Sequence, residues 1–248
     1  MKNTLQRLPV LALVAIPTLA APTKPLDPFT LTGPAGGATL SAPMQIVIML
    51  TLMTLLPALL MSVTPFLRVV IVLHFLRQAL GTQSTPSNQI LIGLSLFLAI
   101  LIMQPVAIQM YQDGWQPMEQ GKLSAAQAAE AGARPLKQFL VKYVREQDVR
   151  LFLEATKSPV PNNPQELELR ILIPAYILSE LKAAFQIGAV LFLPFMVIDL
   201  LVSSVTLSLG MVQLPPVMIS APFKLLLFVL VDGWNLVIGS LLKSFQVQ

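Results

Sequence analysis

Apolar residues form long runs along this chain. The runs cover about 44–63, 90–110, 187–209 and 214–242, and shorter polar segments separate them. About 20 residues of helix cross a hydrocarbon core of about 30 Å, because each residue rises about 1.5 Å. The pattern therefore predicts an all-α, polytopic membrane protein of helical hairpins, with one membrane region at 44–110 and a second at 171–248.

Residues 111–170 differ from these runs. They hold eight acidic and eight basic residues of the chain's 12 and 16. Ser124 and Gln127 have the spacing of a helix capping box, and apolar residues recur at helical spacing from Leu136 to Phe152. We expect a small solvated helical insert, in which Phe139 and Phe152 pack either in a local core or against another subunit.

The N-terminal residues resemble a secretory signal. Lys2 and Arg7 precede a short apolar stretch, and residues 1–20 are predicted to form a cleavable signal peptide. Residues 21–43, rich in Pro, Gly and Thr, are predicted to be a flexible linker. Under the positive-inside rule, Arg68 and Arg77 place the connection between the first two runs in the cytoplasm, which puts 111–170 on the periplasmic side.

Composition narrows the possible functions. Hydrophobic residues make up 55% of the chain and charged residues 11%, against about 25% charged residues in soluble domains. Cysteine is absent and His74 is the single histidine, so we expect no disulfide, thiol nucleophile, metal centre or cofactor. The net charge of +4 comes without basic clusters interleaved with aromatic residues, which disfavours nucleic acid as a partner. No catalytic motif is present, so an enzyme is not expected.

Isolated charges lie within or beside the apolar runs. A charge at the centre of a bilayer costs about 2.5–3.5 kcal/mol, so such groups usually face protein or water. Arg68 and Arg77 are nine residues apart and lie on opposite faces of a helix, so at least one is expected to contact another helix or a headgroup. Asp199 and Asp232 are predicted to be further buried charges, as proton-relay groups or helix caps, and the following Gly-Trp favours a cap for Asp232.

Glu180 and Lys224 are candidates for a salt bridge. A bridge within the chain or between subunits would neutralise both charges, and the alternative is that both reach a headgroup region. Between the last two runs, the segment from Gly210 to Pro216 must interrupt any helix. Met211 in this segment could form a constriction, or the segment could be an ordinary turn at the membrane surface.

Several of these residues belong to a longer pattern. It covers about 44–110 and 171–245 and consists of the following short motifs: PFLR at 65–68, FLRQALG at 75–81, PSNQ at 86–89, IPA at 173–175, SELK at 179–182, PF at 194–195, ID at 198–199, LPP at 214–216, PFK at 222–224 and LVDGW at 230–234. In these motifs the chain resembles the FliP/SctR family of the flagellar and virulence type III secretion export gate. The signal peptide favours the flagellar branch.

The resemblance implies a function. Several copies, a pentamer in the family, are expected to assemble with FliQ and FliR, and with other membrane proteins of the export apparatus, in the inner membrane at the flagellar basal body. Unfolded flagellar subunits would pass through the channel. Glu180 and Lys224 would form an intersubunit salt bridge, and Phe139 and Phe152 would form periplasmic subunit contacts.

The resemblance also places the channel constriction. It would lie at Met211, Val212 and Gln213, where the family carries a methionine-rich loop of which only Met211 is matched. Two other classes stay open at this point. One is an ion-coupled small-solute transporter that uses Asp199 and Asp232, and the other is a purely structural assembly scaffold.

Overall fold

The computed structural model describes residues 42–82, 84–161, 163–211 and 215–246. Every regular element in these ranges is helical, which confirms the all-α prediction. The predicted signal peptide and residues 21–41 of the predicted linker lie outside the described residues, whereas residues 42 and 43 already belong to a helix. The elements are α1 (Ala42–Ser62), α2 (Phe66–Ala79), α3 (Asn88–Met110), the π-helix η1 (Tyr111–Trp115), α4 (Gln116–Glu119), α5 (Ala125–Tyr143), α6 (Glu146–Ala155), the 3₁₀-helix η2 (Pro164–Glu166), α7 (Leu169–Ser208), α8 (Pro216–Leu230) and α9 (Gly233–Gln246).

Three helical stretches in the described ranges are long and apolar enough to cross a membrane. They are Pro43–Ser62, Asn88–Glu119 and Leu169–Ser208, and a fourth is possible if α8 and α9, bent by 64°, form one broken span. The largest difference from the predicted runs concerns α7. It has 40 residues and a length of about 60 Å, twice the thickness of a hydrocarbon core. The run predicted from residue 187 is only its second half, because Glu180 and Lys182 lower the hydropathy of the first half.

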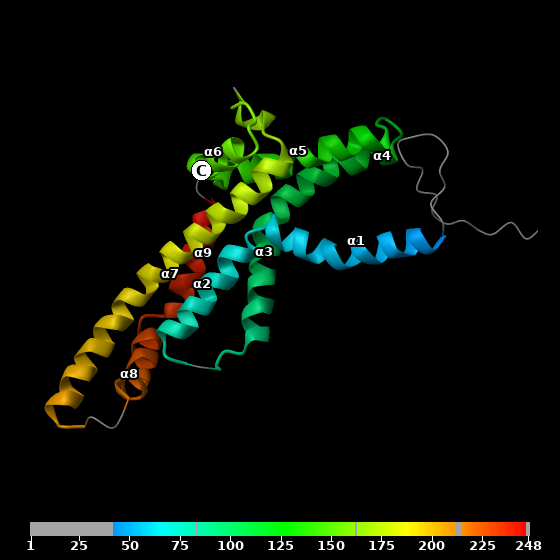
Figure 1. The fold of residues 1–248 in the computed structure, drawn as a ribbon. Coiled ribbons are helices and arrows are strands. Elements are labelled where there is room, and N and C mark those ends of the chain that lie inside the picture. Colours follow the sequence, from blue (N-terminus) through cyan, green and yellow to red (C-terminus); the bar gives the residue numbers. More distant parts are fainter. Residues whose placement is uncertain (1–41, 83, 162, 212–214, 247–248) are drawn as a thin grey trace, which may run out of the picture. The chain divides into compact units, whose positions relative to one another are not determined.

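The chain divides into two units at Thr51 and Leu52, inside α1, and the rest of this section concerns the unit from Leu52 onward. In this unit α2, α7, α8 and α9 lie side by side (Figure 1). Their apolar side chains form what we call the bundle core. Its buried members include Val69, Val72, Leu73, Leu76, Leu91, Ala184, Phe195, Phe228, Val237 and Leu241. Gly188 allows the close approach of α2 to α7, because a Cβ there would collide with the ring of Phe75.

The insert packs on the first half of α7. The amphipathic helix predicted from Leu136 to Phe152 is in fact two helices, because the backbone is extended at Val144 and Arg145 between α5 and α6. At this break the amide of Arg145 donates to Ser179 Oγ of α7, at 3.0 Å, instead of continuing the helix. The predicted capping box of Ser124 and Gln127 is confirmed at the start of α5.

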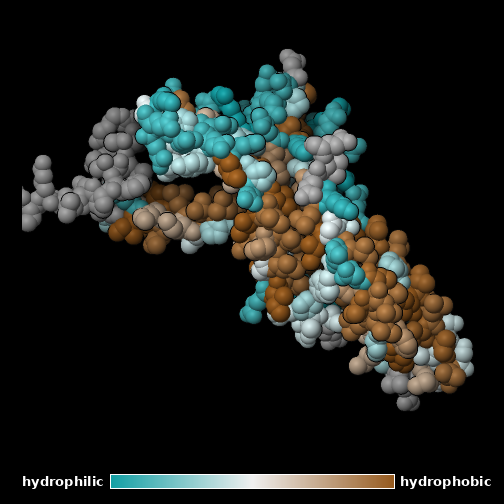
Figure 2. Space-filling view, turned by 180° about the vertical axis from the view of Figure 1, so that it is seen from behind, coloured by the Kyte–Doolittle hydropathy of each residue, from teal (hydrophilic) through white to brown (hydrophobic). Residues whose placement is uncertain are grey.

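A second apolar cluster, the insert core, joins the insert to α7 and α9. Its buried members are Phe139, Leu140, Val149, Leu153, Leu167, Ile171, Leu172, Ala175, Tyr176 and Phe245. Figure 2 shows the polar side chains gathered over the insert and the apolar ones over the far end of the bundle. The unit from Leu52 therefore has two apolar cores, and both α7 and α9 contribute to each of them.

Candidate functional site

A buried ion pair lies where the two cores meet. Arg68, on α2, donates from Nε to Glu180 Oε2 at 2.8 Å and from Nη2 to Glu180 Oε1 at 2.5 Å. Glu180, on α7, is fully buried, and the side chain of Arg68 is 9% exposed. This two-point geometry matches the planar guanidinium to both carboxylate oxygens. We call Arg68 and Glu180 the junction pair.

The last turn of α9 closes over the junction pair. Arg68 Nη1 donates to Ser244 Oγ at 3.2 Å, and the guanidinium carbon lies 4.0 Å from the centre of the Phe245 ring. Tyr143, at the end of α5, stacks its ring edgewise on Phe245 at 5.2 Å and donates its hydroxyl proton to the Phe245 carbonyl. Helices α2, α7 and α9 thus meet at the Arg68 charge, and α5 contacts Phe245 on its other side.

The structure assigns Lys224 a different partner from the predicted one. Lys224 Nζ donates to Asp199 Oδ2 at 2.6 Å, and Ser220 Oγ donates to Asp199 Oδ1 at 2.5 Å. The side chain of Lys224 is 4% exposed and that of Asp199 is 31% exposed. Within one chain, therefore, Glu180 and Lys224 are not each other's partners. An intersubunit bridge between them stays a prediction.

A polar network holds α6 on α7. Ser179 Oγ donates to Asp148 Oδ2 at 2.7 Å, and Lys182 Nζ donates to Asp148 Oδ1. Arg145 Nη2 donates to Gln186 Oε1 at 2.5 Å. Burial of Asp148 would raise its pKa, but the hydrogen bonds from Lys182 and Ser179 and the charges of Lys182 and Arg145 outweigh it and lower the pKa below its ordinary value. The carboxylate therefore stays ionised and holds the insert in place.

The other charges predicted to be buried have different environments. Arg77 is half-buried and donates from Nη1 to Asn88 Oδ1 at 2.7 Å and to the Pro86 carbonyl at 3.2 Å. It thereby holds the connection between α2 and α3, while Arg68 points to α7. Asp232 is exposed in the single chain, because it lies at the bend between α8 and α9, where its carboxylate accepts a hydrogen bond from Asn235 at 3.1 Å. Its positive φ of 50° marks that turn.

The predicted constriction lies at the break between α7 and α8. Met211 is 42% exposed and follows Gly210, whose φ of +73° ends α7. Val212 and Gln213 lie outside the described residues. The segment does separate two helices, but whether it lines a channel stays a prediction.

The two predicted contact residues of the insert differ in burial. Phe139 is 8% exposed and contacts Tyr143 and Tyr176, with ring centres 4.9 and 6.1 Å apart, so its ring belongs to the insert core. Phe152 is half-buried against the same core. Local packing thus accounts for most of the Phe139 surface. A subunit contact stays a prediction for both residues, and Phe152 has more surface left for it.

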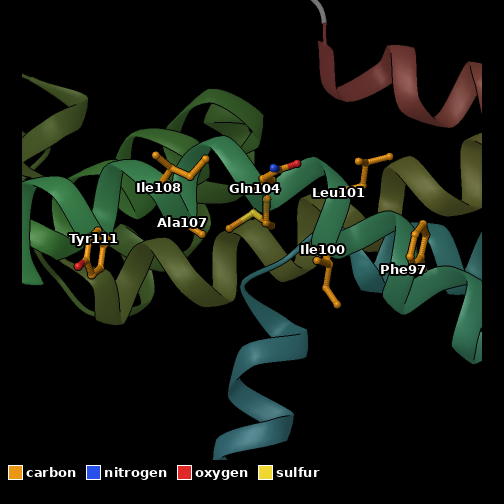
Figure 3. A pocket seen from close by; sticks show the side chains of 8 residues that line it. Phe97, Ile100, Leu101, Gln104, Ala107, Ile108 and Tyr111 are labelled. Atoms are coloured by element: carbon orange, nitrogen blue, oxygen red, sulfur yellow. The ribbon is translucent and has the colours of Figure 1, made fainter.

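An apolar groove runs along α3. It has a volume of about 590 Å³ and is lined by eight residues between Phe97 and Tyr111, with Gln104 among otherwise mainly apolar side chains (Figure 3). No charged group lines it among the described residues, so it is suited to apolar side chains or lipid. In the described ranges, no three His, Asp or Glu side chains are grouped so that they could hold a metal ion.

Sequence reasoning missed the partners of the buried charges and the role of α9. The residues involved for which no such role was predicted are Tyr143, Asp148, Ser179, Lys182, Ser220, Ser244 and Phe245. The opposite charges of Arg68 and Glu180 could have indicated that these residues pair, since both interrupt apolar sequence. Nothing in the sequence indicated that Phe245 would lie over Arg68.

Comparison with known proteins now identifies the family. The model of the FliP family matches residues 49–241. The flagellar biosynthetic protein FliP of Pectobacterium carotovorum is 47% identical over 212 residues, covering 86% of this chain and 82% of that protein. FliP of Bacillus subtilis is 45% identical over 205 residues, covering 83% and 93%, and FliP of Caulobacter vibrioides is 46% identical over 202 residues, covering 82% and 76%. The chain therefore belongs to the FliP family of flagellar biosynthetic proteins.

Proposed function

We propose that this chain is a core subunit of the flagellar type III export gate. Several copies, a pentamer, would assemble with FliQ- and FliR-like subunits into a channel that passes unfolded flagellar proteins across the inner membrane. The observation that carries the proposal is the family match, which runs from within α1 into α9 and so includes the buried pairs and the helix break. The chain would act as a structural part of the assembled channel. The energy for transport would come from its partners and the proton-motive force.

The exposed apolar surface supports an assembled state. The most hydropathic part of α7 is only 11% buried within the chain, and its exposed side chains include Phe185, Leu193, Leu200 and Leu201. Apolar surface of this extent must be covered by lipid or by other subunits. The insert packs on the first half of α7, so the exposed apolar surface of this helix lies from Phe185 onward.

The separate environments of Asp199 and Asp232 favour a channel subunit over an ion-coupled transporter. Asp199 is paired with Lys224, and Asp232 lies at a helix bend, where it accepts from Asn235. A solute transporter that used both carboxylates would need them at one site, whereas these two belong to different segments and have different partners. We therefore keep the channel as the proposed function.

The break after Ser208 supports a constriction at one end of the bundle. Non-helical backbone at membrane depth is tolerated against protein or a water-filled path, and the flexible side chain of Met211 can fill an irregular gap. Around a channel axis, several copies of this segment would form a closed ring of side chains. Glu180 and Lys224 of neighbouring subunits would hold such copies together if assembly rearranges their present pairs.

Native mass spectrometry tests the proposal. The full chain is co-expressed with its FliQ- and FliR-like neighbours and purified in mild detergent, and the mass of the intact complex is measured. We expect a discrete complex with several copies of this chain, each shortened by about the first 20 residues, the size of a signal peptide. A monomer or simple dimer that is indifferent to those partners would contradict the proposal.

A further inference from the structure

Helix α9 connects the two apolar cores along one of its faces. Val237 and Leu241 lie in the bundle core, and Phe245, one further turn along, lies in the insert core. The spacing of four residues keeps all three on one side of the helix. The last turn of α9 is therefore the point where the helix passes from the membrane bundle to the insert.

At this point the Phe245 ring covers a charge that is held away from water. The guanidinium of Arg68 lies 4.0 Å from the ring centre, and Phe245 itself is 6% exposed. A cation over an aromatic face is attracted by the electron density of the ring, and the attraction grows when water is excluded. The ring thus stabilises the junction pair in a way that an aliphatic side chain of similar size could not.

The same residue also holds the insert. The Phe245 carbonyl belongs to the final turn of α9, where carbonyl groups lack partners within the helix, and it accepts the hydroxyl proton of Tyr143 from α5. The two rings are in edge contact at 5.2 Å. One residue therefore contacts the charge between α2 and α7 on one side and the insert on the other.

From this geometry we infer that Phe245 is a positioning residue, which sets the placement of the insert on the membrane helices through Arg68 and Tyr143. The inference rests on the proposed function in one respect, since a correctly placed insert is expected to be needed for assembly of the export gate. Phe245 would act through the two residues that it orients.

Hydrogen exchange on the full chain, purified in its complex, tests the inference. Phe245→Leu removes the ring face and keeps an apolar side chain, and we expect amides at the end of α5 to exchange about thirtyfold faster, because loss of a desolvated cation–π contact has about that effect. Phe245→Tyr, which keeps the ring, should restore exchange to near the wild-type rate. Leu236→Met, an exposed position on the same helix, is the control.

Secretion of flagellar subunits is the second measurement. We expect Phe245→Leu to lower secretion and Phe245→Tyr to restore it. Tyr143→Phe, which keeps both rings and removes the hydrogen bond, should give a smaller change in exchange than Phe245→Leu. Equal exchange in the Leu and Tyr variants would overturn the inference, and faster exchange with normal secretion would overturn the link from insert placement to assembly. Neither result would affect the proposed function, which the mass of the assembled complex tests separately.

Discussion

Removal of the Glu180 charge is the most informative single change in this chain. Glu180→Gln preserves the shape of the side chain but leaves the Arg68 guanidinium, with a side chain 9% exposed, without a counter-charge. Breaking a buried ion pair from one side costs about 3–5 kcal/mol, because the remaining charge is neither solvated nor paired. For a chain of this size, each kcal/mol lowers the thermal midpoint by about 2–4 °C. We therefore expect a decrease of roughly 6–20 °C.

Thermal unfolding in detergent, followed by the fluorescence of Trp115 and Trp234, measures this shift. The matched control is Glu130→Gln, which breaks an exposed pair with Arg134 whose side chains are 77% and 71% exposed, so it should cost only about 0.3–0.5 kcal/mol. A shift for Glu180→Gln no larger than that of the control would refute the reasoning. The double variant Arg68→Met, Glu180→Leu should be less harmful than Glu180→Gln alone, since it leaves no buried charge.

Three further changes test the packing and the polar network. Gly114→Ala would place a Cβ 2.6 Å from a backbone carbonyl of α5, so we expect it to destabilise the fold by about 1–3 kcal/mol in thermal unfolding. The control is Gly93→Ala in α3, which has open space around it and should be neutral or stabilising. Tyr176→Phe should be neutral or stabilising in the same measurement, because the buried Tyr176 hydroxyl has no hydrogen-bond partner among the described residues. Although burial of Asp148 opposes its ionisation, hydrogen bonds from α7 hold its pKa below the ordinary value of 3.8, so its stabilising effect is fully present above about pH 4 and is lost as the pH falls further. Asp148→Asn should remove this effect at neutral pH, so the stability of the variant should fall less than that of the wild type between roughly pH 7 and 3. The same loss of stability in both proteins over this range would contradict the stabilising role of the ionised Asp148.

Several helices and the break after Gly210 could be read from the sequence because their causes are local. Apolar runs, the capping box at Ser124 and the prolines after Gly210 each act within a few residues. The extended backbone at Val144 and Arg145 could not be read in this way, because its cause is a hydrogen bond from the Arg145 amide to Ser179, on a helix far along the chain. The full length of α7 was missed because local hydropathy counts Glu180 and Lys182 as breaks, although both are paired with other helices.

The pairing of the buried charges could not be predicted either, because it also depends on contacts between helices that are distant in sequence. Arg68, Lys224, Glu180 and Asp199 are two bases and two acids in apolar sequence, and they allow two sets of pairs. The sequence cannot distinguish Glu180 with Lys224 from Glu180 with Arg68, since both sets neutralise every charge. The choice depends on which helices are neighbours: α2 packs along the middle of α7, where Arg68 meets Glu180, and α8 packs nearer the C-terminal end of α7, where Lys224 meets Asp199.

Photocrosslinking from residue 211 tests the central claim most directly. A photoreactive amino acid replaces Met211 in the assembled gate. An export substrate that carries a folded domain at its C-terminal end is then stalled in the channel. The proposed channel predicts a crosslink from position 211 to the stalled substrate and none from Leu151, an exposed position on α6. No crosslink from position 211 to a stalled substrate, or equal crosslinks from both positions, would contradict a channel constriction at the break between α7 and α8.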